Sequence, residues 1–180
     1  GAFGLLSLVQ GPVNSASDER APFLSADQLR LYYWTRNTWN SNSELMLATR
    51  AIPSGPFATA QVVGGPNNNI NSPASDEDPY FSEGEQTLFF TSDRPTGDRH
   101  IYATTKQASG LFSEPALVPN LVSSSEDSRP VLSKDGLTIF FKSQREGWNG
   151  DHDGDIWVSQ RSSTSANFAA PTNLTVLNSS

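Results

Sequence analysis

The stretch P-Y-F-S-E-G-E-Q-T-L-F-F at 79–90 decides the fold, because the chain contains versions of it three times. The other copies read P-F-L-S-A-D-Q-L-R-L-Y-Y at 22–33 and P-V-L-S-K-D-G-L-T-I-F-F at 130–141. The copies recur roughly every 50 to 60 residues, which is typical of a repeat architecture in which each unit packs against its neighbours. The repeat therefore predicts the architecture, whereas the activity has to be argued from individual sites.

Each unit predicts four short strands. The first runs from the proline to a serine, at 22–25, 79–82 and 130–133, and the second is rich in aromatic residues, at 29–35, 86–92 and 137–143. Paired aromatics such as Phe89-Phe90 and Phe140-Phe141 favour strands that are covered on both faces. Third and fourth strands follow around 44–47 and 60–63, 100–103 and 115–118, and 155–158 and 171–174. No stretch shows a sustained helical period.

These units predict an all-β fold, a β-propeller segment of three four-stranded blades at about 14–66, 70–120 and 122–177. Residues 1–10 resemble a stray outer strand of a preceding blade. Because closed propellers typically have about four to eight blades, we expect a partial propeller. Either the chain is a fragment of a larger propeller or it closes its ring by self-association.

Composition narrows the function. The net charge of −7 argues against nucleic-acid binding and against attachment to an anionic membrane surface, because both need an excess of Lys and Arg. The chain has no cysteine, which excludes disulfides, thiolate nucleophiles and Cys-ligated zinc. No apolar run approaches about 20 residues, so no membrane-inserted helix is predicted.

The repeat resembles the TolB-type, WD40-like β-propeller repeat. That pattern has an Asp three residues before the proline, then S-x-D-G, an S-D-R element and a D-I-Y strand. The third copy carries Asp127, Pro130, Asp135-Gly136 and Asp155-Ile156-Trp157, and the second carries Ser92-Asp93-Arg94. The resemblance implies a periplasmic, secreted or cell-surface bacterial protein that binds other envelope components. Such repeats also accompany serine peptidase domains.

The stretch N-G-D-H-D-G-D at 149–155 is a candidate calcium site. Asp151, Asp153 and Asp155 alternate around a glycine, and Ca²⁺ prefers six to eight oxygen ligands. The bidentate Glu of an EF-hand loop is missing, and the equivalent loops of the other copies lack the pattern. The alternative is a solvated turn whose Asp side chains bond their own backbone.

Two further groups are candidate binding residues. Glu19, Asp76 and Asp127 each precede a proline by three residues, and first strands of propeller blades line the central channel. Together with the flanking carboxylates they could gather at the channel mouth and attract a cation or a basic peptide; the flanking residues are Asp18, Glu77, Asp78 and Glu126. The alternative is that each braces its blade through hydrogen bonds to backbone amides. Trp39 and Trp148 lie in polar loops and suit stacking on a sugar, or they pack over the blade edge.

Together these features favour a non-enzymatic binding scaffold with an envelope protein or a glycan as partner, contacted through the loops and the channel mouth. The alternative is the propeller part of a hydrolase, either a glycosidase or the accessory domain of a serine peptidase. No G-x-S-x-G nucleophile motif is present. Non-repeated His, Glu or Arg side chains converging on the channel would favour the hydrolase.

Overall fold

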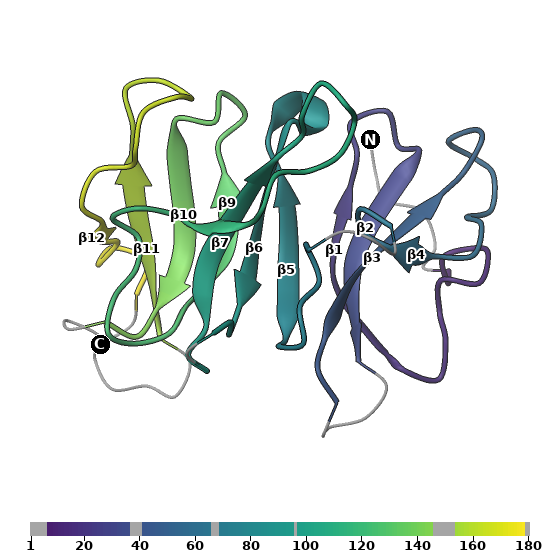
Figure 1. Cartoon of the computed structure of the whole chain (residues 1–180), viewed down its shortest axis with the longest axis horizontal. Helices are drawn as coiled ribbons and strands as arrows, with labels where there is room; N and C mark the ends of the chain where they lie inside the picture. Colours follow the sequence, from purple (N-terminus) through teal and green to yellow (C-terminus); the bar gives the residue numbers. More distant parts are fainter. Residues whose placement is uncertain (1–6, 37–40, 66–68, 96, 146–153, 179–180) are drawn as a thin grey trace.

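The computed structural model describes residues 7–36, 41–65, 69–95, 97–145 and 154–178. Within these ranges the chain forms three four-stranded antiparallel sheets that stand side by side (Figure 1). The described part contains no α-helix and one short 3₁₀ turn, η1 (Glu83–Glu85). No helix among the described residues is long and apolar enough to span a membrane. The all-β partial propeller predicted from the repeat is confirmed.

Each sheet is one blade, and its strands follow one another in sequence order. Blade 1 contains β1 (Asp18–Leu24), β2 (Arg30–Arg36), β3 (Glu44–Thr49) and β4 (Gln61–Val62). Blade 2 contains β5 (Asp76–Phe81), β6 (Thr87–Ser92), β7 (His100–Thr105) and β8 (Ala116–Leu117). Blade 3 contains β9 (Asp127–Leu132), β10 (Thr138–Ser143), β11 (Asp155–Gln160) and β12 (Thr172–Asn173). The blade limits given above stay predictions, and residues 1–6 of the stray strand lie outside the described residues.

Apolar side chains fill the spaces between blades. Phe90, Leu45 and Ile70 are fully buried between blades 1 and 2, and Ile139, Leu121 and Phe168 between blades 2 and 3. Fully burying a side chain of this size stabilises a fold by roughly 1.5–3 kcal/mol. The paired aromatics serve both faces of their strand, as in Phe89 and Phe90, which face different neighbouring blades. Packing between blades is thus the main apolar contribution to stability.

The outer face of blade 3 is an exception. Phe141 is buried, but its neighbour Phe140 is 37% exposed, beside Val131 and Ile156 at 48% and 41%. The equivalent Phe89 and Ile101 of blade 2 are 2% and 1% exposed because blade 3 covers them. Coverage on both faces is therefore confirmed for the aromatic pair of blade 2 and not for that of blade 3, because no described residue packs over this face of blade 3.

A buried polar network holds the inner end of blade 3. Asp127 Oδ1 accepts hydrogen bonds from the Ser143 hydroxyl and the Arg145 guanidinium, each at 2.6 Å. Its Oδ2 accepts the backbone N–H and the hydroxyl of Ser123, both at 2.8 Å. The Arg145 guanidinium also lies 5.1 Å from the ring centroids of Phe141 and Trp157.

Blade 2 repeats this network with Asp76, Arg94, Ser72 and Ser92. A buried carboxylate paired with an arginine and bonded to backbone N–H satisfies its charge without water. We call the Asp–Arg–Ser groups of blades 2 and 3 the repeated network. In blade 1 the residue at the arginine position is Asn37, which lies outside the described residues.

Candidate functional site

The innermost strand of every blade carries a bulge at the same place. The register slips by one residue between Arg20 and Phe23 in β1, between Glu77 and Tyr80 in β5, and opposite Phe140–Lys142 in β9. The extra residue precedes the repeated proline and has a positive φ: 48° at Ala21, 52° at Asp78 and 56° at Arg129. Non-glycine residues rarely adopt this conformation, and such strained positions cluster at functional sites.

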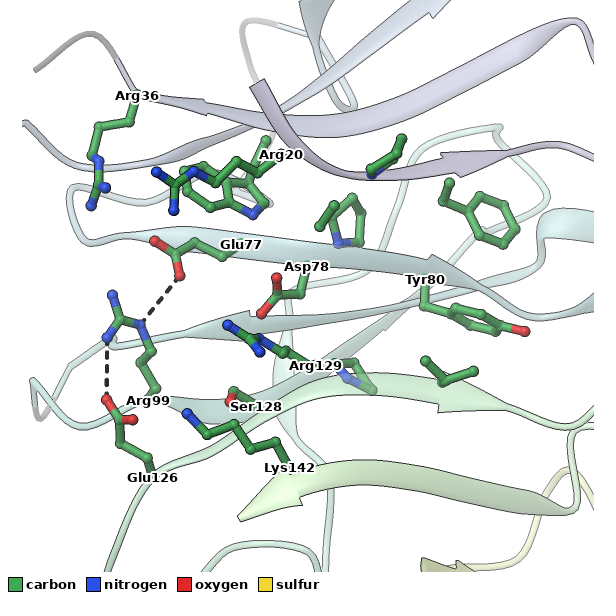
Figure 2. Close-up of a pocket in the computed structure, with 17 residues that line it drawn as sticks. Arg20, Arg36, Glu77, Asp78, Tyr80, Arg99, Glu126, Ser128, Arg129 and Lys142 are labelled. Carbon is green, nitrogen blue, oxygen red and sulfur yellow. Dashed lines mark hydrogen bonds and ion pairs between the residues drawn. The ribbon is translucent and has the colours of Figure 1, made fainter. Parts of the chain in front are cut away.

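A cavity of about 610 Å³ lies against these three bulges (Figure 2). Residues of β1, β5 and β9 line it, so all three blades contribute. We call it the channel-side pocket. Its volume is within the usual range for small-molecule sites. The charged residues that line it are five cations and three carboxylates: Arg20, Arg36, Arg99, Arg129, Lys142, Glu77, Asp78 and Glu126.

On one side of the pocket, Arg99 is held between two carboxylates. Its Nε lies 3.3 Å from Glu77 Oε2, and its guanidinium lies 3.1 Å from Glu126 Oε1 (Figure 2). Glu77 also accepts a hydrogen bond from the buried Ser43 hydroxyl at 2.8 Å. This arrangement ties the loop before β3 to blade 2 and blade 2 to the start of blade 3.

Asp78 occupies the bulge position at the centre of the pocket. Its carboxylate accepts a hydrogen bond from the Thr91 hydroxyl at 3.0 Å, and the same hydroxyl accepts the backbone N–H of Arg129 at 3.0 Å. Burial raises the pKa of the Asp78 carboxyl, and neighbouring Glu77 raises it further, whereas the Thr91 hydrogen bond and Arg129 lower it. The net pKa shift is upward, so Asp78 takes up a proton more readily than an exposed aspartate.

Trp34 forms the wall on the blade 1 side. It is 5% exposed, and the guanidinium groups of Arg20 and Arg36 lie 5.5 Å and 5.6 Å from its ring. Both arginines also face Asp18, at 3.1 Å and 3.9 Å. The indole is therefore a packing element beneath two arginines and presents little of its ring to a ligand.

Strands β9 and β10 of blade 3 contribute three polar side chains: Ser128, Arg129 and Lys142. Ser128 and Lys142 are paired directly across β9 and β10, and Arg129 follows Ser128 at the bulge. Figure 2 shows the three grouped on one side of the pocket. None of these side chains has a hydrogen bond or an ion pair within 4 Å with another described residue; Arg129 interacts with Asp78 only over a longer range.

The pocket-facing positions differ between blades although the backbone repeats. Structurally equivalent positions hold Arg20, Glu77 and Ser128 before the bulge, and Ala21, Asp78 and Arg129 at it. The facing position on the second strand holds Trp34, Thr91 and Lys142. At the bulge itself, blade packing does not require the variation, because the same backbone conformation accepts Ala21, Asp78 and Arg129.

The three repeated carboxylates predicted to gather at the channel mouth occupy other places, whereas the flanking Glu77, Asp78 and Glu126 line the pocket. Asp76 and Asp127 are fully buried in the repeated network, and Glu19 accepts the backbone N–H of Ser15 at 3.2 Å. None of the three lines the channel-side pocket. Their hydrogen bonds are of the bracing kind considered as the alternative, and a binding role for them stays a prediction.

The remaining predicted site residues are mostly outside the described part. Trp39, Trp148, Asp151 and Asp153 lie there. Asp155 is described: it begins β11, is 8% exposed and accepts a hydrogen bond from the Asn173 side-chain amide at 2.7 Å. The described residues contain no group of three or more His, Cys, Asp or Glu side chains that could hold a metal ion. Calcium binding at 151–155 stays a prediction.

Sequence inspection named Glu77, Asp78 and Glu126 only as neighbours of the repeated carboxylates, and it missed the cations that line the pocket. The signal was present, because the residue before each repeated proline changes from Ala to Asp to Arg while its surroundings are kept. A repeat is recognised from the residues that its copies share, whereas these pocket positions carry a different residue in each copy. Their inward placement depends on a bulge that the sequence pattern does not reveal.

Comparison with known proteins supports the fold. No family model matches the sequence, and no curated protein matches it. TolB from Acinetobacter baumannii superimposes with a TM-score of 0.51 at 19% identity, over 84% of this chain and 32% of that one. A thermostable family-43 glycoside hydrolase superimposes with a TM-score of 0.57 at 13% identity, over 90% of this chain and 54% of that one.

The present chain thus spans about a third of the TolB chain and about half of the glycoside hydrolase. The likeness shows that this chain has a TolB-type β-propeller fold. At these identities the likeness concerns the fold alone.

Proposed function

We propose that the chain is a non-enzymatic binding propeller of an extracytoplasmic bacterial protein, which holds a protein or glycan partner through its loops and the channel-side pocket. The observation that carries this proposal is that three equivalent strands direct non-repeated charged residues to one pocket, in which Glu77 and Glu126 are both held in ion pairs with Arg99. The hydrolase alternative also predicts convergence of such residues, but its two carboxyl groups must be available to the substrate. Structural roles repeat from blade to blade, as in the repeated network, whereas a ligand requires different groups at different points. The TolB-type fold and the resemblance of the repeat support a location in the periplasm or on the cell surface.

Screening with matched variants tests this proposal. The unmodified chain and two variants are screened against a glycan array and a peptide library. The pocket variant carries both Arg129→Glu and Lys142→Glu. The control variant carries Lys134→Glu, at a side chain that is 88% exposed outside the pocket. We expect a binder that the Lys134 variant retains and the pocket variant loses. A binder that both variants retain would place the partner elsewhere, and the absence of any binder would contradict a binding function.

A hydrolase is the second candidate, because Glu77, Asp78 and Glu126 converge on the pocket with arginines. The raised pKa of Asp78 suits a proton donor, and glycoside hydrolysis uses two carboxyl groups of different proton affinity. The test is release of nitrophenol from a panel of aryl glycosides. Turnover that Asp78→Asn abolishes and Asp27→Asn preserves would favour the hydrolase, and absence of turnover would favour the binding scaffold.

We further propose that a second copy of the chain covers the open outer face of blade 3. Val131, Phe140 and Ile156 occupy the positions through which blade 2 packs on blade 3, so this face has the shape and chemistry of a blade interface. Sedimentation velocity should show association of the chain that Phe140→Glu abolishes. Leu111→Glu, in an exposed loop of blade 2, is the control. A chain that is monomeric at every accessible concentration would refute this.

A further inference from the structure

We infer that the channel-side pocket takes an anionic ligand, whose phosphate or carboxylate group is bound by Ser128, Arg129 and Lys142 of blade 3. The inference rests on the proposed binding function and names the chemistry of the ligand. It differs from the expectation that an acidic channel mouth attracts cations, because Glu19, Asp76 and Asp127 do not line the pocket and cations outnumber the carboxylates that do.

The charge balance of the pocket is opposite to that of the chain. The chain carries a net charge of −7, but the pocket is lined by five cations and three carboxylates. A cationic cavity on an acidic protein concentrates anions at that place and repels them elsewhere. The pocket therefore favours a ligand of negative charge.

The cations of the pocket are not equivalent. Arg99 is neutralised by Glu77 and Glu126, and Arg20 and Arg36 face Asp18 while they pack on Trp34. Arg129 and Lys142 have no ion pair within 4 Å among the described residues. Arg129 interacts with Asp78 only over a longer range, and Asp78 already accepts the Thr91 hydroxyl. The uncompensated positive charge is thus concentrated on blade 3.

The three blade 3 side chains form a donor set suited to an oxyanion. A guanidinium can bind two oxygens at once, an ammonium binds as a point charge, and a hydroxyl completes the set without adding charge. Direct cross-strand partners have Cβ atoms about 4.5–5.5 Å apart, which brings Ser128 and Lys142 to the same face. Arg129 approaches from the bulge beside them (Figure 2).

The aromatic residues of the pocket argue against a neutral sugar as the main ligand. Trp34 is buried beneath two arginines, and Tyr80 donates its hydroxyl to the backbone carbonyl of Leu132 at 2.8 Å, with its ring centroid 5.1 Å from that of Phe23. The rings are thus engaged by arginines or by one another, whereas Arg129 and Lys142 offer donors that have no ion pair within 4 Å among the described residues. The anionic group is accordingly the main anchor of the ligand.

The repeats supply substitutions that the fold already accepts. Blade 1 has Ala21 where blade 3 has Arg129, at φ values of 48° and 56°. Blade 2 has Thr91 where blade 3 has Lys142. Arg129→Ala and Lys142→Thr thus give blade 3 the residues of its neighbours and remove the anion donors. Lys134→Ala removes one exposed positive charge outside the pocket and is the control for net charge.

The experiment is an NMR titration of the labelled chain with inorganic phosphate, glucuronate or maltotriose at constant ionic strength. We expect saturable shifts at the amides of Ser128, Arg129, Val131 and Lys142 with at least one of the two anions. Arg129→Ala and Lys142→Thr should each weaken binding by about tenfold or more, and Lys134→Ala should leave it unchanged. Lys142 lies on the same face of β10 as Phe140, so association of two chains could also shift the Lys142 signal. Sedimentation velocity under the same conditions measures association and thereby separates it from anion binding.

Each outcome decides the inference. Binding of phosphate alone or of glucuronate alone supports it and identifies the source of the anionic group. Binding that the two blade 3 variants retain would overturn it. Binding of maltotriose alone would overturn the inference of an anionic ligand but would still show that the pocket is a binding site. If none of the three probes binds, the inference of an anionic ligand is overturned, and the library screen still decides the proposed binding function.

Discussion

The repeated network and the channel-side pocket lie within a few residues of each other on the same strands. The network keeps its residue types from blade to blade, whereas the pocket changes them. Asp127 is fully buried and bonds a serine and an arginine equivalent to those that Asp76 bonds one blade earlier. Arg129, two residues further along, is exposed and has Asp78 and Ala21 as its counterparts. Stability therefore resides in what the blades share, and the proposed recognition in what they do not. Substitutions should separate the two.

The largest effect is expected from the apolar packing that the blades share. Phe141→Ala should lower the free energy of unfolding by roughly 3–5 kcal/mol, because the ring is 2% exposed between blades 2 and 3. Phe140→Ala, on the opposite face of the same strand, is the matched control and should change it by less than about 1 kcal/mol. Urea titration measures both, and equal midpoints would refute the assignment of the two faces.

A somewhat smaller loss is expected from the repeated network. Arg145→Ala should cost about 3 kcal/mol, at the low end for breaking a buried ion pair, because Ser123 and Ser143 still bond Asp127. Lys134→Ala removes an exposed cation 4.0 Å from Glu83 and should change stability by less than about 0.5 kcal/mol. Thermal or urea unfolding would contradict the comparison if the two variants behaved alike.

Asp78→Asn should stabilise the fold slightly at neutral pH. Because burial raises the folded-state pKa of Asp78 above its ordinary 3.8, its favourable contribution is complete below that pH and is lost as the pH rises through the folded value. Asparagine has no such titration and tolerates the left-handed backbone. The gain in urea midpoint should be present at pH 7 and absent at pH 3; a gain independent of pH would show that ionisation is not its cause.

The smallest effect on stability is expected at the blade 3 bulge. Arg129→Ala should leave the free energy of unfolding within about 0.5 kcal/mol, since blade 1 folds with Ala21 at the same positive φ. Its loss of anion binding would then be a local effect. A large fall in melting temperature would instead show that Arg129 has a structural role.

The repeat was sufficient to predict the fold. The four strands of each blade could be predicted from prolines, serines and paired aromatics at fixed offsets. These residue types are determined by local turns and by packing between blades. The first strands begin earlier than expected: β5 starts at Asp76 and contains Pro79. The proline sits at a bulge, where a residue without an N–H is tolerated inside a sheet.

The candidate site was less predictable for a physical reason. Asp76 and Asp127 were prominent because they repeat, and they repeat because they hold the blades together. Asp78 and Arg129 differ in type, and only the bulge turns both toward the same pocket. Convergence of unlike residues is a property of the folded strands, which a linear pattern does not display.

The open outer face of blade 3 has a consequence for the symmetry of any assembly. The facing surface at the other end of the chain belongs to blade 1, where Leu24 is 44% exposed while its counterparts Phe81 and Leu132 are buried. The two ends are different surfaces, so a contact between them is heterologous and has no twofold axis. Copies joined in this way form a ring of definite stoichiometry if the rotation per chain divides a full turn evenly. Otherwise they propagate as a filament whose mean length grows with concentration.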